Sequence, residues 1–180
     1  MIKKIILTGL IVFNVFSILY LISPSPALPD LPHSAKSDEP GDTIQIPNVS
    51  GYYTNLSRTE VINFYRANYN GLFRIHLNHP PEKAKEIIRD TIQSYYFEEF
   101  LLPFKESIYI NGFEWENDVF TKPQHRAANR LLYHDVEYKS KVTIRTFPVP
   151  ISHRLVAFFT TELAVFAIAL IYGRFLHRHR

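Results

Sequence analysis

The chain has 180 residues, with 20 Lys and Arg, 17 Asp and Glu, and a formal net charge of +3 at pH 7. It contains no cysteine, which excludes disulfides, thiolate metal ligands and cysteine nucleophiles. Six basic residues flank two apolar segments: Lys3, Lys4, Arg154, Arg174, Arg178 and Arg180. Removing these six from the 20 basic residues, and Glu162 from the 17 acidic residues, leaves 14 and 16 in the rest of the chain. The middle of the chain therefore lacks the basic surface that nucleic-acid binding requires, and no nucleic-acid partner is expected.

Apolar segments lie near both ends of the chain. Residues 5–22 form an 18-residue run without charge, and residues 155–173 form a 19-residue run with one charge. A bilayer core about 30 Å thick needs about 20 helical residues. We therefore expect transmembrane helices over residues 1–22 and 151–174, a basic tail over 175–180, and the lipid bilayer as a partner.

The first segment is interpreted as a retained signal anchor, because its apolar run exceeds the about 7–15 residues of a signal-peptide core. A cleaved signal peptide is the alternative, since Ser25 and Ala27 are small residues of the kind found at cleavage sites. Basic residues in short flanking tails stay cytoplasmic. Both termini are therefore expected in the cytoplasm, with the middle of the chain outside the cell membrane.

Strongly polar residues occur once in each apolar segment. Asn14 lies eight residues before the end of the first segment, and Glu162 lies seven residues after the start of the second. Two antiparallel helices would bring them to nearly equal depth, so we predict a helix–helix contact there, with Ser17 beside it and small Ala169 allowing close approach. Contact with a helix of another protein and transport chemistry are the alternatives for a membrane-embedded carboxyl group.

The segment 23–48 holds six of the 12 prolines and is predicted to be a Pro- and Ser-rich linker. A helix is predicted next, because Ser57 and Glu60 form an S-x-x-E capping box and Gly71 is a natural stop. Its apolar residues recur at helical spacing: Val61, Phe64, Tyr65 and Tyr69.

Residues 49–150 are expected to form an α+β domain, with two helices on one face of an antiparallel sheet. Residues 72–79 alternate like a strand, and a second helix is predicted from Pro81 until Pro103 blocks its continuation. Asn111-Gly112 indicates a tight hairpin turn, and two further strands are predicted around Lys139-Ser140. The predicted apolar face of the second helix comprises Ala84, Ile87, Ile88, Thr91, Ile92, Tyr95 and Tyr96.

The segment 52–71 resembles small secreted bacterial domains in which a Tyr-Thr strand precedes a short helix of the form eVxxFY. The residues that carry the resemblance are Tyr52, Thr54, Val61, Phe64 and Tyr65. The chain as a whole is similar to two-span envelope membrane proteins of bacteria. That resemblance implies a location in the cell envelope and gives no catalytic residues to carry over.

Few residues of the sequence suggest a catalytic or ligand-binding site. His76, His79, His125, His134 and Asp135 could in principle bind zinc, but residues three apart on a strand point to opposite faces, so no metal site is predicted. Acidic pairs occur at Glu98-Glu99 and at Glu114 and Glu116, and the latter pair is interpreted as a solvated strand face. The basic residues Lys122, Arg126 and Arg130 are interpreted as ordinary surface charges, with lipid headgroups or anionic glycans as the alternative.

No phosphate loop, nucleophile elbow or zinc-protease motif is present, and no cofactor is expected. These observations favour a non-enzymatic envelope protein whose two helices anchor an extracytoplasmic binding or scaffold domain, with a membrane or envelope protein as partner. An accessory subunit of a membrane complex is the second hypothesis, and an envelope hydrolase that uses the histidines is the third.

Overall fold

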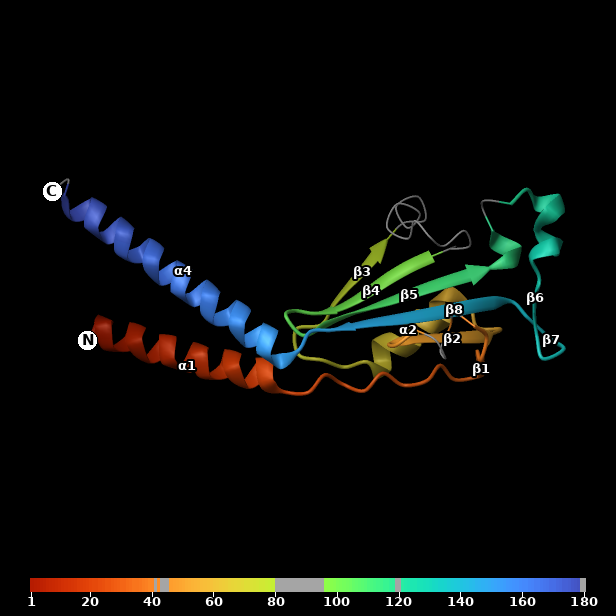
Figure 1. The fold of residues 1–180 in the computed structure, drawn as a ribbon, viewed down its shortest axis with the longest axis horizontal. Coiled ribbons are helices and arrows are strands. Elements are labelled where there is room, and N and C mark those ends of the chain that lie inside the picture. Colours follow the sequence, from red (N-terminus) through yellow and green to blue (C-terminus); the bar gives the residue numbers. More distant parts are fainter. Residues whose placement is uncertain (41, 43–45, 80–95, 119–120, 179–180) are drawn as a thin grey trace. The chain divides into compact units, whose positions relative to one another are not determined.

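A computed structural model describes residues 1–40, 42, 46–79, 96–118 and 121–178 (Figure 1). The chain forms two compact units. The first unit comprises Met1–Pro24 and Val149–Arg180, and the second comprises Ser25–Pro148.

The first unit consists of the two terminal helices, α1 (Ile2–Ile22) and α4 (Ile151–Arg178). Within them, Lys4–Ile22 and Ile151–Phe175 are long and apolar enough to cross a membrane. At 1.5 Å per residue, a helix of 20 residues already spans about 30 Å. The predicted pair of apolar, membrane-length helices near the two ends of the chain is confirmed.

The second unit is built on a six-stranded antiparallel sheet with the strand order β1-β2-β8-β5-β4-β3 (Figure 1). Helix α2 (Arg58–Asn68), a two-stranded ribbon of β6 and β7 and two short 3₁₀ helices complete the part of this unit that the structure describes. The strands are β1 (Ser34–Lys36), β2 (Val49–Thr54), β3 (Ile75–His79), β4 (Tyr96–Leu102), β5 (Glu106–Glu114), β6 (Leu131–Tyr133), β7 (Val136–Tyr138) and β8 (Ser140–Pro148). The 3₁₀ helices are η1 (Trp115–Asn117) and η2 (Pro123–Asn129).

One face of the sheet packs against helix α2 (Arg58–Asn68). The predicted capping box forms as expected: the Ser57 side chain accepts from the Glu60 N–H, and the Glu60 carboxylate accepts from the Ser57 N–H at 2.8 Å. The helix ends at Asn68, three residues before the predicted stop at Gly71. The core that it shares with the sheet consists of Leu31, Tyr52, Val61, Ile62, Tyr65, Tyr69, Tyr96, Phe100, Leu102, Ile108, Ile110, Val142 and Ile144.

The predicted linker is part of this unit. Residues 34–36 form β1 and pair with β2 at the edge of the sheet. Leu31 is 4% exposed within the core, and Leu28 packs against it. Apolar side chains between the prolines supply this packing, whereas the composition of the segment alone favoured an extended spacer.

The predicted turn at Asn111-Gly112 is wrong, because both residues lie within the continuous strand β5. A Cβ at Gly112 would lie 2.0 Å from Cζ of Tyr96, so glycine is needed here for the tyrosine ring that crosses it. The chain turns instead at residues 102–105, between β4 and β5, where Lys105 N–H donates to the Leu102 carbonyl at 2.9 Å.

The predicted second helix within residues 81–95 lies outside the described residues. Its expected continuation from Tyr96 to Leu102 is wrong, since these residues form β4. Trp115–Asn117 is a 3₁₀ helix, so Glu114 and Glu116 do not share a strand face as predicted. The ribbon turn lies at His134-Asp135, and β8 begins at Ser140, the position where a turn was predicted.

Candidate functional site

A buried carboxylate is the least expected feature of the sheet. Side chains alternate along β4, and Tyr96, Glu98, Phe100 and Leu102 are all buried on the face that carries α2. The Glu98 residue is 1% exposed. A charged side chain so placed needs ionic and hydrogen-bonding partners to offset the loss of hydration.

Those partners come from α2 and from β3. The Arg58 guanidinium, at the start of α2, donates to Glu98 Oε1 through Nε at 3.0 Å and also through Nη2. The imidazole Nε2 of His76 lies 2.8 Å from Glu98 Oε2. The His76 ring also stacks on Phe100, with centroids 4.5 Å apart. One carboxylate therefore ties the first turn of the helix to the neighbouring strand.

The tautomer of His76 follows from its second partner. Arg66, near the end of α2, places Nη2 at 2.7 Å and Nε at 3.2 Å from His76 Nδ1. A guanidinium only donates, so Nδ1 accepts and the proton of a neutral imidazole lies on Nε2, directed at Glu98. Arg58, Glu98, His76 and Arg66 form a continuous chain of polar contacts, named here the Glu98 clamp.

The Glu98 clamp holds α2 at both of its ends. A histidine that acts as a general base needs a free nitrogen within reach of a substrate proton, and both nitrogens of His76 are engaged. The arrangement suits a structural role, because removing one member leaves the others partly desolvated without compensation.

A second polar cluster lies on the opposite face of the sheet. Lys141 Nζ is 2.8 Å from Asp42 Oδ2 and 3.0 Å from Glu39 Oε2, and it lies over the ring of Tyr53. The Tyr53 hydroxyl donates to Glu39 at 2.5 Å. Tyr53 also stacks on Tyr133, with centroids 4.4 Å apart. These contacts fasten the segment before β2 onto β2 and β8.

The pKa values of Lys141 and Tyr53 indicate whether either side chain could act as a nucleophile. Burial lowers the pKa of Lys141, but hydrogen bonds to Asp42, Glu39 and Tyr53 outweigh it and raise that pKa above its ordinary value of 10.5. Burial, followed by the hydrogen bond to Glu39, raises the pKa of Tyr53 to about 12. The amine therefore stays protonated and the phenol neutral near pH 7, so neither is an activated nucleophile.

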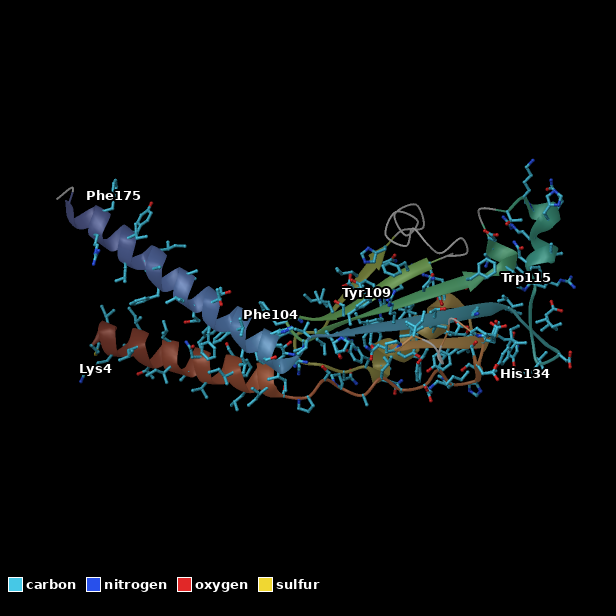
Figure 2. All side chains as sticks on the ribbon, viewed as in Figure 1. Lys4, Phe104, Tyr109, Trp115, His134 and Phe175 are labelled. Carbon is cyan, nitrogen blue, oxygen red and sulfur yellow. The ribbon has the colours of Figure 1, made fainter. Side chains whose placement is uncertain are left out.

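The histidines considered as zinc ligands are not brought together. His76 lies on the α2 side of β3 and His79 on the other side, where its Nε2 is 3.3 Å from Glu99. His125 is in η2. His134 lies in the ribbon turn (Figure 2). Its Nε2 is 3.6 Å from Asp38 Oδ1. Within the described part of the chain, no group of three or more potential ligands is placed to hold a metal ion.

The basic residues Arg126 and Arg130 make internal contacts. Arg126 Nη1 donates to the Glu116 carbonyl at 2.8 Å. Arg130 lies over the Trp115 ring at 5.3 Å and 3.6 Å from the Glu137 carboxylate. These contacts stabilise the 3₁₀ segments at the end of the sheet that carries Trp115 (Figure 2), and they support the interpretation as ordinary surface charges.

Arg154 joins the two terminal helices. Its Nη1 donates to the Leu21 carbonyl at 3.1 Å, and its Nε donates to the Val149 carbonyl at 2.7 Å. The Leu21 carbonyl belongs to the last turn of α1, where the helix itself supplies no N–H. The guanidinium therefore caps α1 from the first turn of α4, and the residue is 7% exposed.

The predicted contact between the spans stays a prediction. The Asn14 amide donates to the Leu10 carbonyl of its own helix at 3.0 Å, and among the described contacts no hydrogen bond joins it to Glu162. Ser17 and Glu162 are half-buried, and Ala169 is exposed. The Arg154–Leu21 bond nevertheless fits the predicted register, because Asn14 lies seven residues from Leu21 and Glu162 eight from Arg154, a difference of about 1.5 Å in depth.

Sequence reasoning missed the roles of Glu98, Arg58 and Arg154. Glu98 sits at a buried register position between Tyr96 and Phe100, and this alternation was the available signal once the segment was recognised as a strand. Arg154 carried a positional signal, a basic residue at the first turn of an apolar helix.

No protein-family model, curated protein or solved structure matches the chain.

Proposed function

We propose that this chain is an integral membrane protein of a cell envelope, anchored by α1 and α4, which displays residues 25–148 on the extracytoplasmic side as a binding or scaffold domain. The observation that carries the proposal is that residues 25–148 lie, along the sequence, between two helices of membrane-spanning length. Short basic flanks at both ends favour cytoplasmic termini.

Two features support a binding or scaffold role over catalysis. The Glu98 clamp uses both nitrogens of His76, and the cluster around Lys141 keeps its amine protonated. Both clusters connect segments that are distant in sequence, which is the arrangement expected of a rigid displayed domain.

Alkaline extraction of membranes from cells that express truncated chains tests the anchoring. The full chain and chains lacking either residues 1–24 or residues 149–180 should stay in the membrane pellet, because one apolar helix is sufficient for anchoring. The chain that lacks both segments should be soluble. Release of the full chain by alkali would contradict the proposal.

An accessory subunit of a membrane complex is the second candidate. It is supported by the Asn14 amide, which donates within its own helix and makes no hydrogen bond to Glu162 among the described contacts, so that a partner protein is a candidate source of contacts for Glu162. The chain should then purify in mild detergent with a second membrane protein in fixed ratio. Glu162→Gln, which keeps a donor and an acceptor, should retain that protein, and Glu162→Leu should lose it.

A further inference from the structure

One end of the sheet carries a concentration of exposed apolar side chains. The strand register sets this end: Glu106 pairs with Pro148, Leu102 with Glu106, and Ile75 with Leu101. The turn from β4 to β5, the turn before β3 and the end of β8 therefore lie together at this end of the sheet. Its exposed apolar residues, named here the apolar rim, are Leu72, Phe73, Ile75, Phe104 and Phe147.

The most exposed members of the rim lie at the tips of two similar turns. Arg74 N–H donates to the Gly71 carbonyl at 3.2 Å, and Lys105 N–H donates to the Leu102 carbonyl at 2.9 Å. Phe73 and Phe104 occupy the third position of these four-residue turns, with φ of 63° and 62°. Positive φ at that position favours glycine.

Neither phenylalanine is buried in the core. The Phe73 and Phe104 residues are 58% and 68% exposed, so burial within the domain does not offset the unfavourable backbone conformation. Among the described residues, the other non-glycine residues with positive φ are His33, Asn48, His134 and Asp135, which are the residue types that tolerate it. An exposed aromatic ring on such a turn indicates contact with an apolar phase outside the domain.

The short covalent connection from the rim to α4 indicates that this apolar phase is the bilayer. β8 ends at Pro148 and α4 begins at Ile151, so three peptide steps, at most about 11 Å, separate the rim from a helix of membrane-spanning length. The opposite end of the sheet, which carries His134 and the ribbon, has no such connection (Figure 2).

The charges beside the rim suit a lipid surface. Arg145 is exposed and lies over the Phe147 ring at 5.0 Å. The Arg74 guanidinium, half-buried, donates to the Tyr69 carbonyl at 2.5 Å. Glu106, which pairs with Pro148 at this end of the sheet, is 8% exposed and accepts a hydrogen bond from the Tyr69 hydroxyl. Basic side chains next to exposed aromatic rings are typical of surfaces that rest on anionic lipid headgroups.

We propose that the apolar rim is a membrane-contact surface, in which Phe73 and Phe104 insert into the headgroup region of the bilayer that holds α4. The contact would fix the distance of the domain from the bilayer. This inference rests on the membrane anchoring proposed above, but it holds whichever side of the membrane the domain faces.

Depth measurement with single fluorophores tests this contact, and the absence of cysteine makes single-site labelling direct. The variants Phe104→Cys, Phe73→Cys and Leu132→Cys of the full chain, labelled and reconstituted in vesicles of phosphatidylcholine and phosphatidylglycerol, would be compared. Leu132 is the matched control, because it is an apolar residue 64% exposed in the ribbon at the other end of the sheet. Labels on Phe104→Cys and Phe73→Cys should be quenched by lipids that carry a nitroxide near the headgroup and be shielded from aqueous iodide, with the opposite result for Leu132→Cys.

Equal iodide quenching at all three positions would overturn the proposal and leave the rim to a protein partner. A fourth variant, Leu163→Cys within α4, separates this failure from failure of the anchoring itself. If its label is quenched by nitroxide lipids while that of Phe104→Cys is not, the rim proposal alone is wrong. If neither is quenched, the anchoring proposal is wrong, and with it the rim proposal.

Discussion

At the scale of single residues, the molecule departs from expectation where side chains meet partners that are distant in sequence. Glu98 is a carboxylate at a core position, and its partners Arg58 and His76 lie 40 and 22 residues away. Arg154 binds a carbonyl 133 residues away. Such partners are brought in by the fold, so the residue types around each position do not reveal them.

The Glu98 clamp gives the first prediction. Glu98→Gln keeps the shape of the side chain but removes the charge that compensates Arg58, and should lower the free energy of unfolding by about 3 kcal/mol, the lower end of the range for a buried pair. The lower end applies because the Arg58 side chain is 31% exposed. Chemical denaturation measures the change. Glu137→Gln is the control, because its side chain is 51% exposed in a pair with Arg130, and it should change the free energy by less than about 0.5 kcal/mol.

The positive φ of Phe104 gives the second prediction. Phe104→Gly removes a strain of about 1–2 kcal/mol and adds freedom to the unfolded chain worth about 0.5–1 kcal/mol, so the variant should be equally stable or more stable by about 1 kcal/mol. Leu132→Gly, at a position without positive φ, should be less stable. Equal losses of thermal stability in the two variants would show that the Phe104 ring supports the fold.

At the scale of elements, a local sequence signal was correct at the start of α2 and wrong at Asn111-Gly112, where a distant residue decides the structure. The capping box of α2 depends on residues three apart, and it was predicted correctly. The Asn111-Gly112 pair matched a hairpin turn, but Gly112 is required by the ring of Tyr96 on the adjacent strand. The true turn holds Phe104 in the place of glycine, and its Pro103 was interpreted only as the end of a helix.

The packing of Gly112 gives the third prediction. Gly112→Ala should destabilise the domain by about 1–3 kcal/mol, because its Cβ would occupy space filled by the Tyr96 ring. In a Tyr96→Leu background the same substitution should cost much less, which a double-mutant cycle by denaturation measures. Additive effects would be evidence that Gly112 acts through the backbone conformation of a turn.

Carboxylates in the segment before β2 give the fourth prediction. The hydrogen bond from Tyr53, and then Lys141, holds the pKa of Glu39 below its ordinary value of 4.5. Hydrogen bonds from Tyr52 and Lys36 lower the pKa of Asp30. A lowered folded-state pKa adds stability above the unfolded pKa, and this stability is lost as the pH falls through the folded value.

Stability should therefore fall on acidification below about pH 4.5, and it should fall less steeply in Glu39→Gln than in the parent chain. Unfolding curves at a series of pH values measure both slopes. An unchanged slope in Glu39→Gln would mean that Glu39 does not contribute to the acid sensitivity.

At the scale of the whole molecule, composition and hydropathy predicted the plan of two apolar helices around a mixed domain, because these are properties of long segments. The N-terminal boundary of the domain was harder to predict from the sequence. Residues 23–48 read as a linker from their prolines, yet β1 and Leu31 belong to the sheet unit. The second helix predicted within residues 81–95 stays a prediction.

That boundary gives the fifth prediction. A fragment of residues 25–148 should fold cooperatively without the helices, and a fragment of residues 49–148 should be less stable, because it lacks β1 and the Leu31 side chain. Loss of a buried leucine alone costs about 2–5 kcal/mol. Circular dichroism during thermal unfolding compares the fragments, and equal melting temperatures would show that residues 25–48 are a linker after all.

The central proposal is a topology in which residues 25–148 lie on the extracytoplasmic side of the membrane and both termini lie in the cytoplasm. Single cysteines at Leu132 and Lys4 of the cysteine-free chain, exposed to a membrane-impermeant maleimide in intact cells whose outer layer is permeabilised, test it most directly. We expect labelling of Leu132→Cys without lysis and of Lys4→Cys only after lysis. Labelling of Lys4→Cys in intact cells, with protection of Leu132→Cys, would contradict it.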